Sequence, residues 1–174
     1  KHVAGGTHVD MLPDETSKIF DSIVVGPGEE SFLNAIKDNC IKKKYYQDYK
    51  KYPFLDTPYP DRSLLPKNSL INKNMFKQYG DYNATMVYFS RGCFYNCSYC
   101  VYNVPNQLQS KSPNLITQEI QELKNNYDIQ AILLKDEIAL NPNKKIFHSQ
   151  MEAIGNENIK WRGQTTSVGT DEHL

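Results

Sequence analysis

The chain has 174 residues and a mass of 20.0 kDa, which is enough for one domain or for one domain and part of another. Its 20 Lys and Arg residues balance its 20 Asp and Glu residues, so the formal net charge is zero. This balance argues against a globally basic nucleic-acid binder and against an acidic tail protein. From this charge balance we expect no nucleic-acid partner. No apolar run approaches the roughly 20 residues that cross a bilayer, so we expect no membrane span.

Charge is distributed unevenly and suggests three regions. The net charge is −4 over residues 1–40, +6 over residues 41–80 and −2 over residues 81–174. The first region has the pattern of the end of an α/β unit, in which a short buried strand over residues 23–25 leads through a glycine turn into a helix. The predicted helix has an apolar face at helical spacing, formed by Phe32, Leu33, Ile36 and Cys40.

The turn between this strand and helix, Gly26-Pro27-Gly28, could present backbone N–H groups to an anion. However, Ser31 stands where a dinucleotide fingerprint has its third glycine, and Glu29 and Glu30 would repel a phosphate. We therefore interpret the segment as an ordinary strand-to-helix junction with acidic residues at the positive end of the helix dipole.

Residues 41–82 are predicted to form a connector. They contain seven of the twelve tyrosines, and they also contain prolines that discourage long regular elements, namely Pro53, Pro58, Pro60 and Pro66. Three consecutive lysines, residues 42–44, stand beside several of these tyrosines, a combination that can bind single-stranded nucleic acid. Because so few basic residues cluster there, we favour tyrosines that pack on a neighbouring domain.

The third region predicts alternating strands and helices. Strands are expected over residues 84–90, 131–134 and 158–162, with helices starting at Ser112-Pro113 and Asn141-Pro142. This β-α-β-α-β order, with continuous apolar strands, predicts a parallel sheet. The apolar face of the first helix would comprise Ile116, Ile120, Leu123 and Tyr127, and that of the second Phe147, Met151 and Ile154.

Three of the four cysteines, Cys93, Cys97 and Cys100, fall within eight residues. Iron–sulfur clusters normally take four cysteines, so three thiolates would leave one iron open for a small chelating molecule. Crowded thiols of this kind are typical of a metal or cluster site in a reducing compartment, and we expect a cytoplasmic protein. The alternatives are a zinc site with Cys40 or a histidine as fourth ligand, and three free structural thiols.

The position of the cysteine loop favours a reactive site. The loop follows the first strand of the predicted parallel sheet, and α/β proteins place their active sites at the carboxyl ends of such strands. Asp136 and Glu137 follow the second strand and Gly163-Gln164 ends the third, so we expect all three segments at one rim. The alternative for the two acidic residues is a helix-entry turn in which both carboxylates are solvated.

The segment Ser90-Arg91-Gly92-Cys93-x3-Cys97-x2-Cys100, with Tyr99 before the last cysteine, resembles the radical S-adenosylmethionine (radical SAM) family. Gly5-Gly6 and residues 20–29 resemble the end of the cobalamin-binding domain found in one large subfamily, and residues 59–66 resemble that subfamily's linker. The resemblance implies an α/β fold in three parts. These are the C-terminal remnant of a Rossmann-like cobalamin-binding domain over residues 1–40, a linker over residues 41–82, and the first three strands of a radical SAM (β/α) barrel over residues 83–174.

The resemblance also implies cofactors. Cys93, Cys97 and Cys100 would bind a 4Fe–4S cluster whose fourth iron chelates S-adenosylmethionine, and reduction would cleave that molecule to methionine and a 5′-deoxyadenosyl radical. Tyr99 would line the adenine pocket, Asp136 or Glu137 would bind the methionine amino group, and Gln164 would contact the nucleoside. Gly5 and Gly6 would belong to a cobalamin site, although two motifs of the family's cobalamin domain are absent here and Pro27 replaces its usual Glu.

We therefore expect a fragment of an enzyme that starts radical chemistry, for methyl transfer or cyclisation, on a small-molecule substrate that the sequence does not identify. Its electron donor would be a protein such as flavodoxin or ferredoxin. Three strands are too few to close a barrel, so Leu174 is expected to be a cut end. The alternatives are an iron–sulfur or electron-transfer module without catalysis, and a zinc-binding interaction domain.

Overall fold

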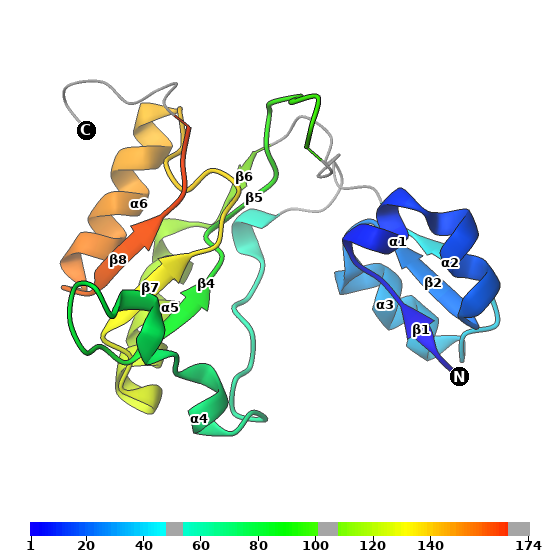
Figure 1. The fold of residues 1–174 in the computed structure, drawn as a ribbon, viewed down its shortest axis with the longest axis horizontal. Helices are drawn as coiled ribbons and strands as arrows, with labels where there is room; N and C mark the ends of the chain where they lie inside the picture. The colour runs from blue at the N-terminus through cyan, green and yellow to red at the C-terminus, as the bar shows by residue number, and fades with distance from the viewer. Residues whose placement is uncertain (48–53, 101–107, 167–174) are drawn as a thin grey trace. The chain divides into compact units, whose positions relative to one another are not determined.

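A computed structural model describes residues 1–47, 54–100 and 108–166 (Figure 1). The chain forms two compact units. The first contains Lys1–Pro53 and Phe94–Gln107, and the second contains Phe54–Cys93 and Leu108–Leu174. Tyr49, Tyr52 and Pro53 of the predicted connector, and the expected cut end at Leu174, lie outside the described residues.

The first unit is built on a parallel sheet with the strand order β1-β2-β3. The predicted strand around Ile23 is confirmed as the central strand β2, and it places Val24 in a small core with Ala35 and Tyr45. The third strand comes from residues that we expected to belong to the connector. In chain order the elements are β1 (Val3–Ala4), α1 (Thr7–Met11), α2 (Pro13–Ile19), β2 (Ser22–Val25), α3 (Gly28–Lys37) and β3 (Lys44–Tyr46).

Helix α3 does not bury the apolar face that its sequence predicts. Phe32, Leu33 and Ile36 are 47%, 53% and 56% exposed, whereas Ser31 and Ala35 are buried. Small side chains let the helix backbone approach β2 and β3 closely, so the larger side chains lie on its outer side. Cys40 lies beyond the end of the helix, half-buried against the core of this unit.

The second unit confirms the predicted β-α-β-α-β order, but the strand expected over residues 84–90 ends at Val87, and Ser90 pairs in a separate sheet. Strands β4, β7 and β8 form a parallel sheet in that order, with Met86 beside Leu133 and Leu133 beside Arg162. A second, two-stranded antiparallel ribbon pairs β5 with β6. In chain order the elements are η2 (Phe54–Asp56), α4 (Lys67–Leu70), η3 (Lys73–Phe76), β4 (Ala84–Val87), β5 (Ser90–Arg91), β6 (Gln109–Ser110), α5 (Pro113–Tyr127), β7 (Ala131–Leu134), α6 (Lys144–Asn156) and β8 (Lys160–Gly163).

Helices α5 and α6 cover the sheet of the second unit. The predicted apolar face of α5 is buried along its whole length, and the helix ends at Asp128 in a left-handed conformation. Helix α6 starts two residues later than Pro142, because Asn143 accepts hydrogen bonds from the N–H groups of Lys145 and Ile146. Ile154 is buried, while Phe147 and Met151 are half-buried.

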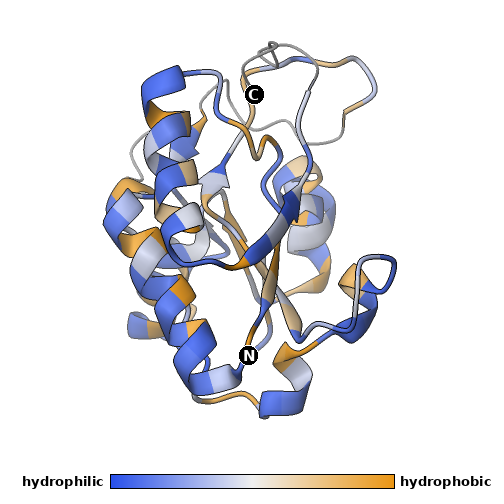
Figure 2. Ribbon diagram, turned by 90° about the vertical axis from the view of Figure 1, so that its left-hand side faces the viewer, coloured by the Kyte–Doolittle hydropathy of each residue, from blue (hydrophilic) through white to orange (hydrophobic). Residues whose placement is uncertain are grey.

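In Figure 2, hydrophilic and hydrophobic residues alternate along the helices, as expected when one face packs against a sheet. Within the described ranges, each helix is too short or too polar to cross a bilayer. The assignment of these two units to a cobalamin domain and to a barrel stays a prediction.

Candidate functional site

The segment that follows β7 binds the backbone that leads into the cysteine loop. The Phe89 N–H donates to Asp136 Oδ1 at 2.8 Å, and the Gly92 N–H donates to Glu137 Oε2 at 3.2 Å. The Ser90 hydroxyl donates to the Ile138 carbonyl at 3.1 Å. These three hydrogen bonds fix the chain up to the residue before Cys93, as expected for strand ends that meet at one rim.

The two carboxylates differ in exposure. Asp136 is 3% exposed, so the alternative of a solvated turn is wrong for this residue. Burial raises its pKa from 3.8 to about 6, although hydrogen bonds from the Ser90 and Phe89 backbone oppose the shift, and the charge of Glu137 adds to it. Glu137 is half-buried and reaches the backbone beside Cys93. The sequence predicts the same role for both acidic residues. Only Glu137 is both partly exposed to solvent and hydrogen-bonded to the residue before Cys93.

None of the four cysteines, all of which lie within the described ranges, forms a disulfide. Cys93 is half-buried, whereas Cys97 and Cys100 are exposed. The Cys100 N–H donates to the Cys97 carbonyl at 3.0 Å, so these two ligand candidates lie on one turn. The boundary between the two units falls between Cys93 and Phe94. Within the described ranges, no group of three His, Cys, Asp or Glu side chains is close enough together to hold a metal ion.

Tyr99 and Gln164, the predicted nucleoside contacts, lie at the surface. Tyr99 is 85% exposed, and a hydrogen bond with Cys97 together with the charges of Cys97 and Cys100 raises the pKa of its hydroxyl. The Gln164 side chain is exposed, and its carbonyl accepts a hydrogen bond from the Ala139 N–H at 2.8 Å. The preceding Gly163 permits this contact, because a Cβ atom there would lie 2.6 Å from Ala139 Cβ.

Gly5 and Gly6, the cobalamin candidates, precede α1 in the first unit. A Cβ atom on Gly5 would meet Val24 at ordinary contact distance, whereas one on Gly6 would face open space. Gly6 has a φ of 95°, a conformation that favours glycine. This geometry leaves the backbone accessible at Gly6.

The junction between β2 and α3 is closed by the protein's own side chains. Gln47 Oε1 accepts hydrogen bonds from the N–H groups of Glu30 and Ser31, each at 3.1 Å, and Asp10 Oδ1 accepts from the Gly26 N–H at 2.8 Å. Two N–H groups of the first helical turn are therefore already paired, which supports our interpretation of an ordinary strand-to-helix junction.

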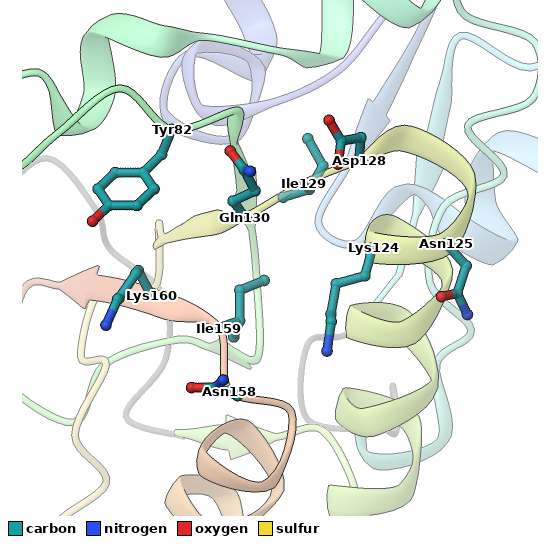
Figure 3. A pocket seen from close by; sticks show the side chains of 9 residues that line it. All are labelled: Tyr82, Lys124, Asn125, Asp128, Ile129, Gln130, Asn158, Ile159 and Lys160. Carbon is teal, nitrogen blue, oxygen red and sulfur yellow. The ribbon is translucent and has the colours of Figure 1, made fainter.

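A cavity of about 500 Å³ opens at the other end of the second unit's sheet (Figure 3). Its walls come from the residues just before β4, β7 and β8 and from the end of α5. It therefore lies at the amino ends of the strands, away from Asp136 and Glu137, and the sequence predicts no site there. The lining residues are Tyr82, Lys124, Asn125, Asp128, Ile129, Gln130, Asn158, Ile159 and Lys160.

Comparison with known proteins identifies a protein that is similar to this chain. No protein-family model matches it. It is 30% identical over 131 residues to a bacteriochlorophyllide d C-8(2)-methyltransferase of Chlorobaculum tepidum, a match that covers 70% of this chain and 27% of that protein. The chain thus resembles part of a methyltransferase. It spans about a quarter of that relative's length, so the similarity supports an enzyme function only in general terms.

Three features of the structure were not predicted from the sequence. They are the burial of Asp136, the closure of the β2–α3 junction by Gln47, and a buried charge on α5. The last had a visible signal, since Glu119 stands beside Ile120 on the apolar face of that helix. The other two depend on contacts between residues 16 to 47 positions apart.

Proposed function

We propose that this chain is part of a radical SAM enzyme in which Cys93, Cys97 and Cys100 hold a 4Fe–4S cluster. The observation that carries the proposal is the pair of carboxylates after β7, which fix Phe89 and Gly92 on the approach to Cys93. A loop with a fixed base and three closely spaced cysteines is suited to ligand binding rather than to packing. The similarity to a methyltransferase supports the same conclusion in general terms.

The donor set fits this group. Thiolates are the usual ligands of iron–sulfur clusters, and Cys97 and Cys100 are exposed and share one turn. When bound, the cluster and S-adenosylmethionine supply the reductive cleavage that starts radical chemistry.

Other side chains of this chain are assigned to the contacts with S-adenosylmethionine. Glu137 is the better candidate for the methionine ammonium, because Asp136 is buried and its Oδ1 is already bound to the Phe89 N–H. A carboxylate attracts an ammonium and orients it by charge-assisted hydrogen bonds. We assign the exposed ring of Tyr99 to the adenine and the exposed amide of Gln164 to the nucleoside.

The whole protein is proposed to be a methyltransferase with a small-molecule substrate, an electron donor such as flavodoxin or ferredoxin, and a cobalamin bound near Gly5 and Gly6. The methyl-transfer part rests on the similarity to the Chlorobaculum tepidum enzyme. The accessible backbone at Gly6 is compatible with a ligand there.

Anaerobic reconstitution of the chain with iron and sulfide tests the proposal. We expect a cluster whose electron paramagnetic resonance spectrum changes when S-adenosylmethionine is added to the reduced protein, and we expect 5′-deoxyadenosine among the products. A cluster with no response to S-adenosylmethionine would instead indicate an electron-transfer module. Bound zinc without iron, measured by elemental analysis, would indicate a zinc-binding domain.

Glu137→Gln gives a sharper test of the ammonium assignment. The amide keeps the size of the side chain and can still accept the Gly92 N–H, but it loses the charge. We expect normal iron content and at least about tenfold weaker binding of S-adenosylmethionine, since a charge-assisted hydrogen bond contributes roughly 1.5 to 3 kcal/mol. Unchanged binding in Glu137→Gln would contradict the assignment.

A further inference from the structure

The second unit buries two cationic side chains that both contact one carboxylate. Arg62 Nη2 lies 2.5 Å from Glu119 Oε1, and Lys111 Nζ lies 2.8 Å from Glu119 Oε2. The three residues are 6%, 4% and 1% exposed in the order Arg62, Lys111, Glu119. We call these residues the ion triad. A core of apolar side chains is usually at least as stable as a buried ion pair, so stability alone does not account for the triad.

The ion triad joins two segments that are far apart in the sequence. Arg62 comes from residues 54–62, which we call the strap, and Lys111 directly follows β6. Glu119 on α5 binds both cations at once, one with each carboxylate oxygen. The strap and the end of β6 are therefore held to the same point on α5.

The other end of the strap contacts both strands of the β5–β6 ribbon. The Phe54 N–H donates to Gln109 Oε1 at 3.3 Å on β6. The Arg91 guanidinium of β5 lies 4.8 Å from the centre of the Phe54 ring, and the Lys111 ammonium lies 5.7 Å from it. The Ser112 N–H donates to the Leu55 carbonyl at 3.0 Å. Phe54, at 4% exposed, is thus packed among cations and backbone groups of the ribbon.

The ribbon is the base of the cysteine loop. Ser90 pairs with Ser110 and Arg91 with Gln109, and the chain between these strands contains all three clustered cysteines. Two strands of two residues each are far below the size of a ribbon that is stable by itself. The register of the ribbon, and with it the point where the cysteine loop begins and ends, therefore needs support from elsewhere.

We propose that the strap is a positioning element for the cysteine loop. Phe54 and Arg62 are positioning residues that act through the β5–β6 ribbon and the ion triad, and they need not touch the ligand. The identity of the ligand rests on the proposed function, whereas the support of the ribbon does not. Groups that orient metal ligands through a second layer of contacts typically change metal affinity by about 10- to 100-fold.

A matched pair of variants tests the strap. Phe54→Leu removes an aromatic ring that contacts the ribbon, and Phe76→Leu removes another ring of the same unit. Phe76 is equally buried at 3% exposed, and its ring lies 5.4 Å from the Arg162 guanidinium. The two substitutions make the same chemical change, so they should lower the thermal midpoint by similar amounts.

Iron release and amide exchange distinguish the two variants. After reconstitution, we expect Phe54→Leu to release iron to a chelator about tenfold faster than the wild type, and Phe76→Leu to match the wild type. Hydrogen exchange at the Lys111 and Ser112 amides should accelerate only in Phe54→Leu. Equal iron release from both variants would overturn the proposal. If the wild type takes up no cluster, the proposed function fails, and the exchange rates alone decide whether the strap supports the ribbon.

The ion triad needs a variant that leaves no buried charge unpaired. Arg62 Nη1 also lies 3.8 Å from Glu122 Oε2, so the variant must neutralise Glu122 as well. The combination Arg62→Met, Lys111→Met, Glu119→Leu and Glu122→Gln replaces the triad by apolar side chains and should keep or raise the thermal midpoint. We expect this variant to fold and still to release iron about tenfold faster than the wild type. Wild-type iron release from the stable combined variant would show that the triad has no positioning role.

Discussion

Two strand-to-loop junctions, one in each unit, use polar side chains to hold backbone N–H groups. They differ in how much of the following loop these hydrogen bonds hold. After β2, Asp10 and Gln47 pair the N–H groups of Gly26, Glu30 and Ser31, so the turn is completed by the chain itself. After β4, Asp136 and Glu137 hold the backbone only as far as Gly92, and the cysteines that follow form no disulfide. A parallel sheet offers such junctions wherever a strand ends, and the local side chains decide which of them can take a ligand.

The largest expected effect sharpens this comparison at the thiols. Cys93→Ala, Cys97→Ala and Cys100→Ala should each abolish cluster binding, because every thiolate is needed when only three are available. Cys40→Ala should keep the cluster, since Cys40 packs against the core of the first unit. Iron and sulfide analysis after anaerobic reconstitution checks both results. Loss of iron from Cys40→Ala would contradict the three-ligand site.

Gly26→Ala should break the closed junction. Gly26 has a φ of 85°, and a Cβ atom there would lie 2.1 Å from the Gln47 carbonyl oxygen. We expect the free energy of unfolding to fall by about 4 kcal/mol, in the range of the most damaging substitutions. Gly155→Ala in α6 is the control, because a Cβ atom there meets no neighbour, and it should raise stability by about 0.5 to 1 kcal/mol. Urea unfolding measures both, and similar values for the two variants would rule out the steric explanation.

The open junction should be sensitive to pH through Asp136. Its pKa is about 6 in the folded protein and 3.8 when unperturbed, so between these values the folded chain binds more protons than the unfolded chain. The free energy of unfolding therefore falls as pH rises from about 4 to 6, by about 3 kcal/mol in total. Asp136→Asn cannot titrate but can still accept the Phe89 N–H, so this contribution should vanish. Parallel pH curves for the two proteins would show that Asp136 titrates normally.

Gln47→Ala should give the smallest effect. The substitution leaves the N–H groups of Glu30 and Ser31 without the Gln47 oxygen, and loss of a helix cap costs about 1 kcal/mol. The exposed Gln164→Ala offers a control in which the backbone hydrogen bond to Ala139 is retained and stability should not change. Thermal unfolding of the two variants checks the difference, which should disappear if water replaces the Gln47 oxygen fully.

The sequence predicted the three strands of the parallel sheet and the two long helices of the second unit, because each has a strong local pattern, but it did not predict the β5–β6 ribbon or the short helices before β4. The face formed by Ile116, Ile120, Leu123 and Tyr127 is buried as expected. In α3 a similar pattern was misleading, since periodicity identifies an apolar face but not whether another element covers it. Phe32 and Ile36 are exposed for this reason.

The sequence predicted which residues belong to the candidate site, but not that Asp136 and Glu137 differ in their roles. Asp136 and Glu137 are neighbours in the sequence, but Asp136 is buried and bound to Phe89, 47 positions away, whereas Glu137 is half-buried. The strap was visible as a proline-rich connector, but its contacts with Gln109 and Glu119 join residues 55 and 57 positions apart. Such contacts depend on tertiary packing, which local sequence patterns do not reveal.

The close approach of Ala139 and Leu134 to Gly163 restricts which substitutions the chain can accept at this position. A side chain at this position would collide with Ala139 and Leu134, while the neighbouring Gln164 side chain is exposed and unconstrained by packing. A library randomised at both positions and selected for folding would therefore return glycine at the first and almost any residue at the second. The end of β8 thus combines one invariant position with one that selection can adapt freely to a new ligand.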